Sequence, residues 1–146
     1  MIDHLAPLIG EWKVETSLGP APARSSFEWA LDGTFVLQRS TIEIPEAPDA
    51  LCVIAAEGDG FRQHYFDSRG VVRLYAMTFD GRTWTLRREA PDFSDFGFAQ
   101  RFTGELDGDT IRGEWLRTAD GSPAADGVER IDGDWMHDFD LTYTRL

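Results

Sequence analysis

The sequence predicts an all-β protein, in which about ten strands form an up-and-down antiparallel closed barrel. Turn residues, most often Asp-Gly, recur at regular intervals along the chain. They favour tight hairpins because glycine has no Cβ and Asp tolerates the left-handed region. The runs between the turns are about 8–11 residues long and rich in β-branched and aromatic residues, which is typical of consecutive strands. These runs follow one another without room for crossover helices.

We expect a short helical turn over residues 2–8, which Pro7 limits in length, before the first strand. The strands are expected at residues 10–18, 24–32, 34–44, 50–57, 60–67, 70–80, 82–90, 97–106, 109–118 and 134–146. Residues 91–96 and 119–133 are expected to form the longer loops, and the second of these contains three glycines and a proline. No internal repeat or linker interrupts the pattern, so residues 1–146 are expected to form a single lipocalin-like domain.

Alternation along the strands indicates which side chains point into the barrel. In the first expected strand, Trp12 and Val14 alternate with Glu11, Lys13 and Glu15. An apolar inner face and a polar outer face, repeated over many hairpins, favour a sheet that closes on itself, because closure removes exposed edges. The alternation is less clear in three strands, those expected at 34–44, 60–67 and 70–80.

Charge and composition limit the classes of partner. The net charge is −12 and the arginines are scattered, so neither nucleic acid nor an anionic membrane is an expected partner. No apolar run approaches the roughly 20 residues of a membrane-spanning helix, and the N-terminus lacks the pattern of a secretory signal. We therefore expect a soluble cytoplasmic protein, and leave a homodimer open. Cys52, the single cysteine, is expected to be a small buried strand residue.

Two distant segments are predicted to meet if the barrel closes. The first strand begins with the Gly-x-Trp motif of Gly10 and Trp12, and the last strand carries Arg145. Both Trp12 and Arg145 have inward parity, and a guanidinium stacked on an indole would stabilise the closure by roughly 0.5–2 kcal/mol. This combination resembles the calycin superfamily of lipocalins and fatty-acid-binding proteins.

Three further segments are similar to a bacterial lipocalin-like family of unknown function, related to nitrobindin-type barrels. They are the stretches from Tyr65 to Gly70, from Phe102 to Gly104 and from His137 to Arg145. Nitrobindin-type barrels hold haem through a histidine, so the resemblance implies His137 as a candidate iron ligand, because its parity with the apolar side chains of the last strand predicts an inward orientation. A hydrogen-bonded or solvated His137 at the barrel mouth is favoured instead, since one strand histidine is a poor haem signature.

Several polar residues occupy inward-facing or ambiguous positions and mark the expected ligand site. Buried polar groups cost about 1–3 kcal/mol each unless they are satisfied, so they indicate an internal network, ordered water or a polar ligand head. Arg39 or Arg88 is expected to meet a ligand carboxylate, as the resemblance to fatty-acid-binding proteins implies. The candidate ligand-binding residues are Arg39, Tyr65, Tyr75, Arg88, Gln100, His137 and Tyr143.

The sequence offers no recognisable catalytic constellation or metal site. The acids gather in turns or on outward parity, there is no nucleophile motif, and no His and Cys lie at zinc-like spacing. The first hypothesis is therefore a non-enzymatic binding protein for a small apolar or amphipathic molecule. The alternatives are a haem-binding protein that uses His137 and a filled barrel that acts as an interaction module. We expect any ligand site toward the barrel end opposite Trp12.

Overall fold

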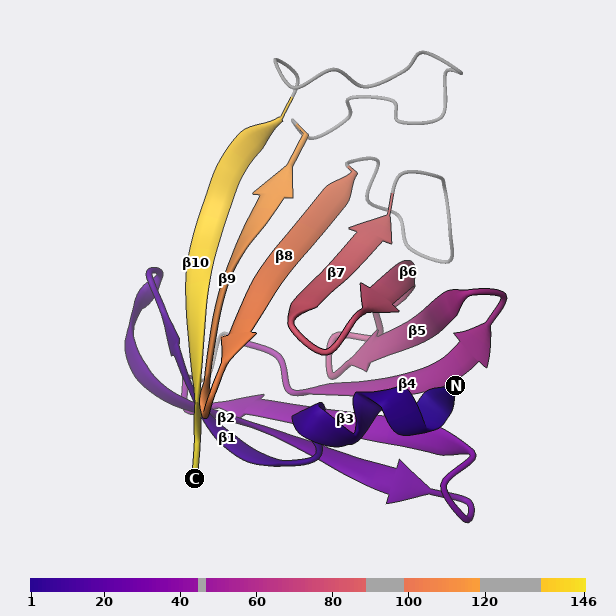
Figure 1. The fold of residues 1–146 in the computed structure, drawn as a ribbon. Helices are drawn as coiled ribbons and strands as arrows, with labels where there is room; N and C mark the ends of the chain where they lie inside the picture. Colours follow the sequence, from indigo (N-terminus) through magenta and orange to yellow (C-terminus); the bar gives the residue numbers. More distant parts are fainter. Residues whose placement is uncertain (45–46, 89–98, 119–134) are drawn as a thin grey trace.

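Ten antiparallel strands and one short 3-10 helix form the part of the chain that the structure describes, residues 1–44, 47–88, 99–118 and 135–146 (Figure 1). In this computed structural model each strand pairs with the next one along the chain, and β1 pairs with β10 to close the barrel. The predicted fold class is confirmed. The elements are η1 (Ile2–Leu8), β1 (Gly10–Thr16), β2 (Gly19–Ala30), β3 (Phe35–Ile42), β4 (Ala50–Glu57), β5 (Gly60–Asp67), β6 (Val72–Phe79), β7 (Thr83–Arg88), β8 (Gln100–Asp107), β9 (Thr110–Arg117) and β10 (Met136–Arg145).

The largest difference from the predicted boundaries is at β2, which begins at Gly19 instead of residue 24. Pro20 and Pro22 obscured this part of the strand, because proline cannot donate a ladder hydrogen bond. They lie where the register with β1 shifts between Val14 and Thr16, so the sheet accommodates them at an irregularity. The loops expected at residues 91–96 and 119–133 lie outside the described residues.

The two ends of the barrel differ in their connections. At the end that contains Trp12, here called the Trp12 end, tight turns join β6 to β7 and β8 to β9. Gly81 and Gly108 adopt φ values of +97° and +62° in these turns, which are unfavourable for residues with a Cβ. Asp80 accepts backbone hydrogen bonds within the first of them. The opposite end, where β3 connects to β4 near Pro48, is here called the Pro48 end.

Aromatic side chains pack the interior toward the Trp12 end. The Trp84 ring lies at the centre of this group, with centroid distances of 4.8 Å to Phe102, 5.8 Å to Phe27 and 5.8 Å to Tyr143. Trp12 contacts Tyr143 edge to face at 6.4 Å. Leu5 and Leu8 of η1 are fully buried in the same cluster, and η1 lies against β3 (Figure 1). This half of the barrel is therefore filled by its own side chains.

Trp12 and Arg145 form the predicted contact across the closure of the barrel. The two residues face each other in the β1–β10 register, and the guanidinium carbon lies 4.2 Å from the centroid of the Trp12 ring. Arg145 also donates hydrogen bonds to the backbone oxygens of Ile9, at 2.9 Å, and Pro7, at 2.7 Å. The indole nitrogen of Trp12 donates to Leu8 O at 2.9 Å. The pair thus ties η1 to the first and last strands.

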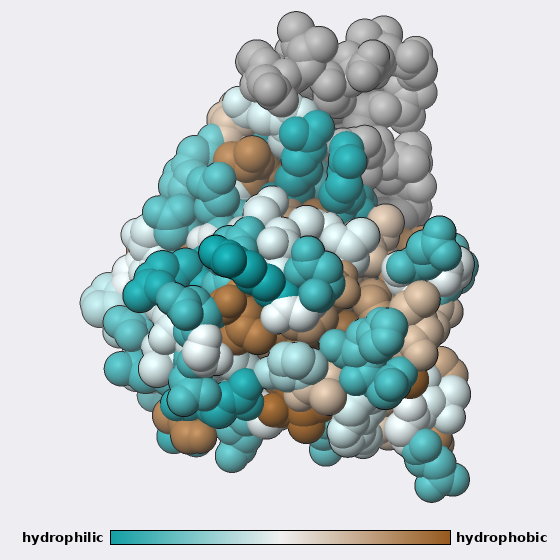
Figure 2. All heavy atoms as spheres, in the orientation of Figure 1, coloured by the Kyte–Doolittle hydropathy of each residue, from teal (hydrophilic) through white to brown (hydrophobic). Residues whose placement is uncertain are grey.

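The outer face of the barrel is largely hydrophilic (Figure 2), as the net charge of −12 leads one to expect. Exposed ion pairs link neighbouring strands there, among them Arg62 with Glu57 and Arg82 with Glu105. Such pairs contribute little to stability because both charges remain hydrated. Within the described ranges, no helix is long and apolar enough to cross a membrane.

Replacement of Arg145 with Ala is expected to lower the free energy of unfolding by about 1–3 kcal/mol, because the stacking on Trp12 and two hydrogen bonds to the η1 segment are lost together. Urea denaturation measures the loss. Arg112→Ala, at an exposed position on β9, serves as the control and is expected to change the free energy of unfolding by less than about 0.5 kcal/mol. Equal losses in the two variants would contradict the account of the closure.

Candidate functional site

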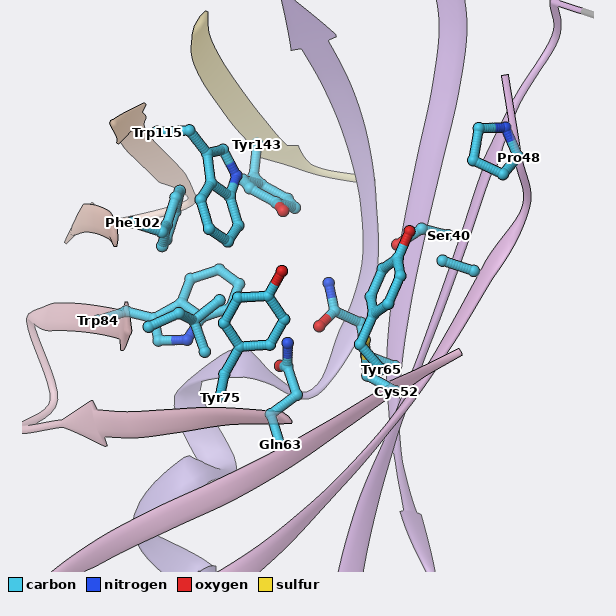
Figure 3. A pocket seen from close by; sticks show the side chains of 13 residues that line it. Ser40, Pro48, Cys52, Gln63, Tyr65, Tyr75, Trp84, Phe102, Trp115 and Tyr143 are labelled. Carbon is cyan, nitrogen blue, oxygen red and sulfur yellow. The ribbon is translucent and has the colours of Figure 1, made fainter. Parts of the chain in front are cut away.

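A cavity of about 230 Å³ lies inside the barrel in the half toward the Pro48 end (Figure 3). Its size follows from the strand number, because about eight strands already give an interior that side chains can fill or that holds one small ligand, and the diameter grows with each added strand. Most of its wall is aromatic. The six aromatic lining residues are Tyr65, Tyr75, Trp84, Phe102, Trp115 and Tyr143.

Small side chains from two neighbouring strands form the part of the cavity wall opposite the aromatic residues. Ser40 from β3 and both Ala50 and Cys52 from β4 line it, together with Pro48 from the connection between these strands. Ser40 pairs directly with Ala50 in the β3–β4 register. Because these side chains are short, they do not reach the aromatic wall that projects from β5 to β10 (Figure 3).

A second hollow of about 180 Å³ shares Ser40, Pro48, Trp115 and Tyr143 with this cavity. Its remaining lining includes Ile42 near the end of β3. The empty space in the barrel therefore extends from the cavity toward the Pro48 end, which would give a ligand a route to the interior.

The cavity disfavours electric charge. None of the described residues that line it is an Asp, Glu, Lys, Arg or His. Burial raises the pKa of the Cys52 thiol to about 12, and burial also raises the pKa of the Tyr143 hydroxyl above its usual value. The pKa of Tyr65 is raised by burial and by its hydrogen bond to the Asp67 carboxylate. The cavity thus keeps the titratable groups of its described lining in their uncharged forms at neutral pH.

Most polar groups around the cavity have partners. Gln38 donates from Nε2 to Ser25 Oγ at 3.0 Å, and the Tyr65 hydroxyl donates to Asp67 Oδ2 at 2.9 Å. Gln63 differs, because its Oε1 is buried and has no hydrogen-bond partner among the described residues. The indole nitrogen of Trp84 is likewise buried and has no hydrogen-bond partner among the described residues.

A buried polar cluster surrounds the Tyr75 hydroxyl, and its other members are not among the described residues that line the cavity. Gln100 Oε1 accepts hydrogen bonds from the Tyr75 hydroxyl at 2.8 Å, from Arg73 Nη1 at 3.3 Å and from Arg88 Nε at 3.3 Å. Both arginines are buried, with 8% and 3% of their surface exposed. The Tyr75 hydroxyl therefore belongs to this cluster, while Tyr75 is also part of the cavity lining.

The structure brings five of the seven predicted ligand-binding residues to the inside of the barrel. Tyr65, Tyr75 and Tyr143 line the cavity, whereas Arg88 and Gln100 are buried in the polar cluster that includes the Tyr75 hydroxyl. Their inward or ambiguous positions in the sequence thus correspond to interior positions in the fold, and their role in binding stays a prediction.

Arg39, which the sequence placed at an inward-facing or ambiguous position, does not face the interior. Arg39 is exposed, and its Nε donates to Glu28 Oε1 at 3.1 Å on the outer face. In β3 it is Gln38 that faces inward, paired with Phe27 and Cys52 on the neighbouring strands. A shift of one residue in strand phase moves a side chain to the opposite face of a sheet, and the weak alternation of this strand did not fix the phase.

The inward orientation that parity predicted for His137 is wrong, whereas the favoured alternative, a hydrogen-bonded or solvated side chain, agrees with the structure. The β9–β10 register shifts between His137 and Phe139, whose partners Leu116 and Trp115 are consecutive residues, so β10 carries an extra residue at this point. The bulge reverses the parity on which the prediction depended. His137 is half exposed on the outer face, and its Nε2 lies 2.8 Å from Asp140 Oδ1. No histidine is among the described residues that line the cavity, so the residues present do not fit a haem held by His137.

The two glutamines of the cavity lining and one arginine of the cluster are among the residues missing from the sequence prediction: Gln38, Gln63 and Arg73. All three lie on strands in which apolar and polar residues alternate only weakly. The alternation is weak because these polar residues occupy inward positions. A signal was therefore present, because Gln63 shares parity with Phe61 and Tyr65 on β5.

A scan against protein-family models and a search of the curated proteins found no match for this chain. The function must therefore be inferred from the cavity and its chemistry.

The contact between His137 and Asp140 predicts a measurable titration. The hydrogen bond and negative charge of Asp140, with a smaller effect of Glu114, raise the pKa of His137 above its usual value of about 6.5. In an NMR titration, Asp140→Asn is expected to lower the pKa of His137, while Asp109→Asn at the Trp12 end leaves it unchanged. A pKa that does not respond to Asp140→Asn would contradict the outward placement of His137.

Proposed function

We propose that this protein binds a small, uncharged, largely apolar molecule inside the barrel. The observation that carries the proposal is the cavity of about 230 Å³, walled by six aromatic residues, in a barrel whose other half is filled. A void in a protein core costs about 24 cal/mol per Å³, so leaving this space empty would forgo on the order of 5 kcal/mol. A bound apolar molecule would recover dispersion contacts with the aromatic wall.

The size and chemistry of the cavity support a compact neutral ligand. A cavity of roughly 150 Å³ already holds benzene, while drug-sized ligands occupy sites of about 300–1,000 Å³. The volume of about 230 Å³ therefore suits a molecule of one ring or two fused rings. A fatty-acid carboxylate fits less well, because Arg39 is on the outer face and Arg88, bonded to Gln100, is not among the described residues that line the cavity.

We further infer that the chain is a calycin-type barrel. Two features support this: the closed meander of ten strands and the stacking of Arg145 on Trp12 between the first and last strands. The inference concerns architecture and adds nothing about the ligand, since related folds carry unrelated functions.

The test is toluene binding measured by NMR titration of the wild type and two matched variants. Ala50 lines the cavity, so Ala50→Phe places a ring inside it and is expected to weaken toluene binding at least about tenfold, because the two rings compete for one space. Ala76→Phe makes the same change at an exposed position on β6 between the inward residues Tyr75 and Met77, and is expected to leave binding unchanged.

Two results would contradict the proposal. One is wild-type protein that binds none of toluene, indole and naphthalene, which would favour the filled barrel as an interaction module. The other is an equal loss of toluene binding in both variants, which would place the ligand elsewhere than in the cavity.

A further inference from the structure

We propose that the ligand is an aromatic molecule with an uncharged O–H or N–H donor, of the phenol type, and that Gln63 accepts its hydrogen bond. The inference deepens the proposed function and rests on it, because it names the chemical class of molecule that the cavity selects. It is carried by Gln63, a residue of the cavity lining whose buried amide oxygen has no hydrogen-bond partner among the described residues.

Gln63 is held in place by its two neighbouring strands. It lies on β5, paired with Ile54 on β4 and Tyr75 on β6, and only 3% of its surface is exposed. Its side chain lines the cavity, and its Oε1 has no hydrogen-bond partner among the described residues. Buried polar atoms in folded proteins are nearly always hydrogen-bonded, so the unsatisfied Gln63 Oε1 calls for a donor that the described residues do not supply.

Three polar side chains of the cavity lining already donate to other acceptors. The Tyr75 hydroxyl, from the residue paired with Gln63, donates to Gln100 Oε1 at 2.8 Å. The Tyr65 hydroxyl donates to Asp67, and the Gln38 amide donates to Ser25. A tyrosine hydroxyl carries one proton, so neither tyrosine can also donate to Gln63 without losing its present acceptor.

The walls around Gln63 favour a ring. Tyr75 contacts Tyr65 edge to face at 6.3 Å and Trp115 at 5.7 Å, and Trp115 contacts Phe102 at 5.2 Å. Figure 3 shows the Gln63 amide beside the Tyr75 ring, with the other aromatic side chains around the same space. Tilted and edge-to-face contacts are the preferred geometry between aromatic rings, so a further ring can add to this set.

The donor must be uncharged. The described lining contains no acid that would pair with an ammonium group and no base that would pair with a phenolate. The amide oxygen of Gln63 would also repel an anion. A neutral phenol, aniline or indole satisfies the acceptor without bringing a charge into the barrel.

The experiment compares phenol with toluene, which has nearly the same size and shape but no donor. Calorimetric titrations of the wild type and Gln63→Leu are expected to show phenol binding weakened about tenfold by the substitution and toluene binding not weakened. Gln63→Leu is also expected to fold with a Tm no lower than that of the wild type, because Gln63 Oε1 has no partner to lose.

Gln38→Leu is the matched control. It removes a glutamine of the same cavity whose amide already donates to Ser25, so it is expected to change phenol and toluene binding by the same factor. Pyridine, an acceptor without a donor, is expected to bind the wild type and Gln63→Leu equally at mildly alkaline pH.

Each other outcome has a distinct meaning. If both probes bind and Gln63→Leu weakens them equally, or weakens neither, the inference about Gln63 is overturned while binding in the cavity stands. Weaker pyridine binding in Gln63→Leu would overturn it as well, because the Gln63 amide would then act as a donor. If neither phenol nor toluene binds the wild type, the proposed function fails and the inference fails with it.

Discussion

Closure of the sheet between β1 and β10 is the constraint on which the rest of the structure depends. Once ten strands close, every strand has an inner face, and the interior has a volume that side chains, water or a ligand must fill. Trp12, Phe27 and Trp84 fill it toward one end. Toward the other end, Ser40 and Ala50 are too short to reach the opposite wall, and a cavity results.

The position of the charged groups follows from the same geometry. Arginines at inward positions would place positive charge in the cavity, but Arg73 and Arg88 are hydrogen-bonded to Gln100, and neither is among the described residues that line the cavity. Tyr75 thus serves two environments, with its hydroxyl in the polar cluster and its ring in the cavity wall. The cavity is left with neutral polar groups, which can select a ligand by hydrogen bonding and shape.

The sequence was sufficient to predict features that depend on local chemistry. The hairpins follow from turn residues such as Asp80 and Gly81, and the contact between Trp12 and Arg145 follows from parity and closure. The orientations of Arg39 and His137 could not be predicted in this way, because strand phase and the bulge in β10 depend on pairing with other strands. The role of Gln63 was hidden for a further reason: only the packed interior shows which acceptor lacks a donor.

The central claim is that the barrel interior is filled toward Trp12 and empty toward Pro48. A crystal structure under xenon pressure tests it most directly, because xenon enters apolar cavities of this size without needing a specific ligand. The account predicts xenon density between Tyr75, Trp115 and Cys52, and none beside Trp12 or Phe27. A xenon-free interior, with side chains occupying the space beside Gln63, would contradict it.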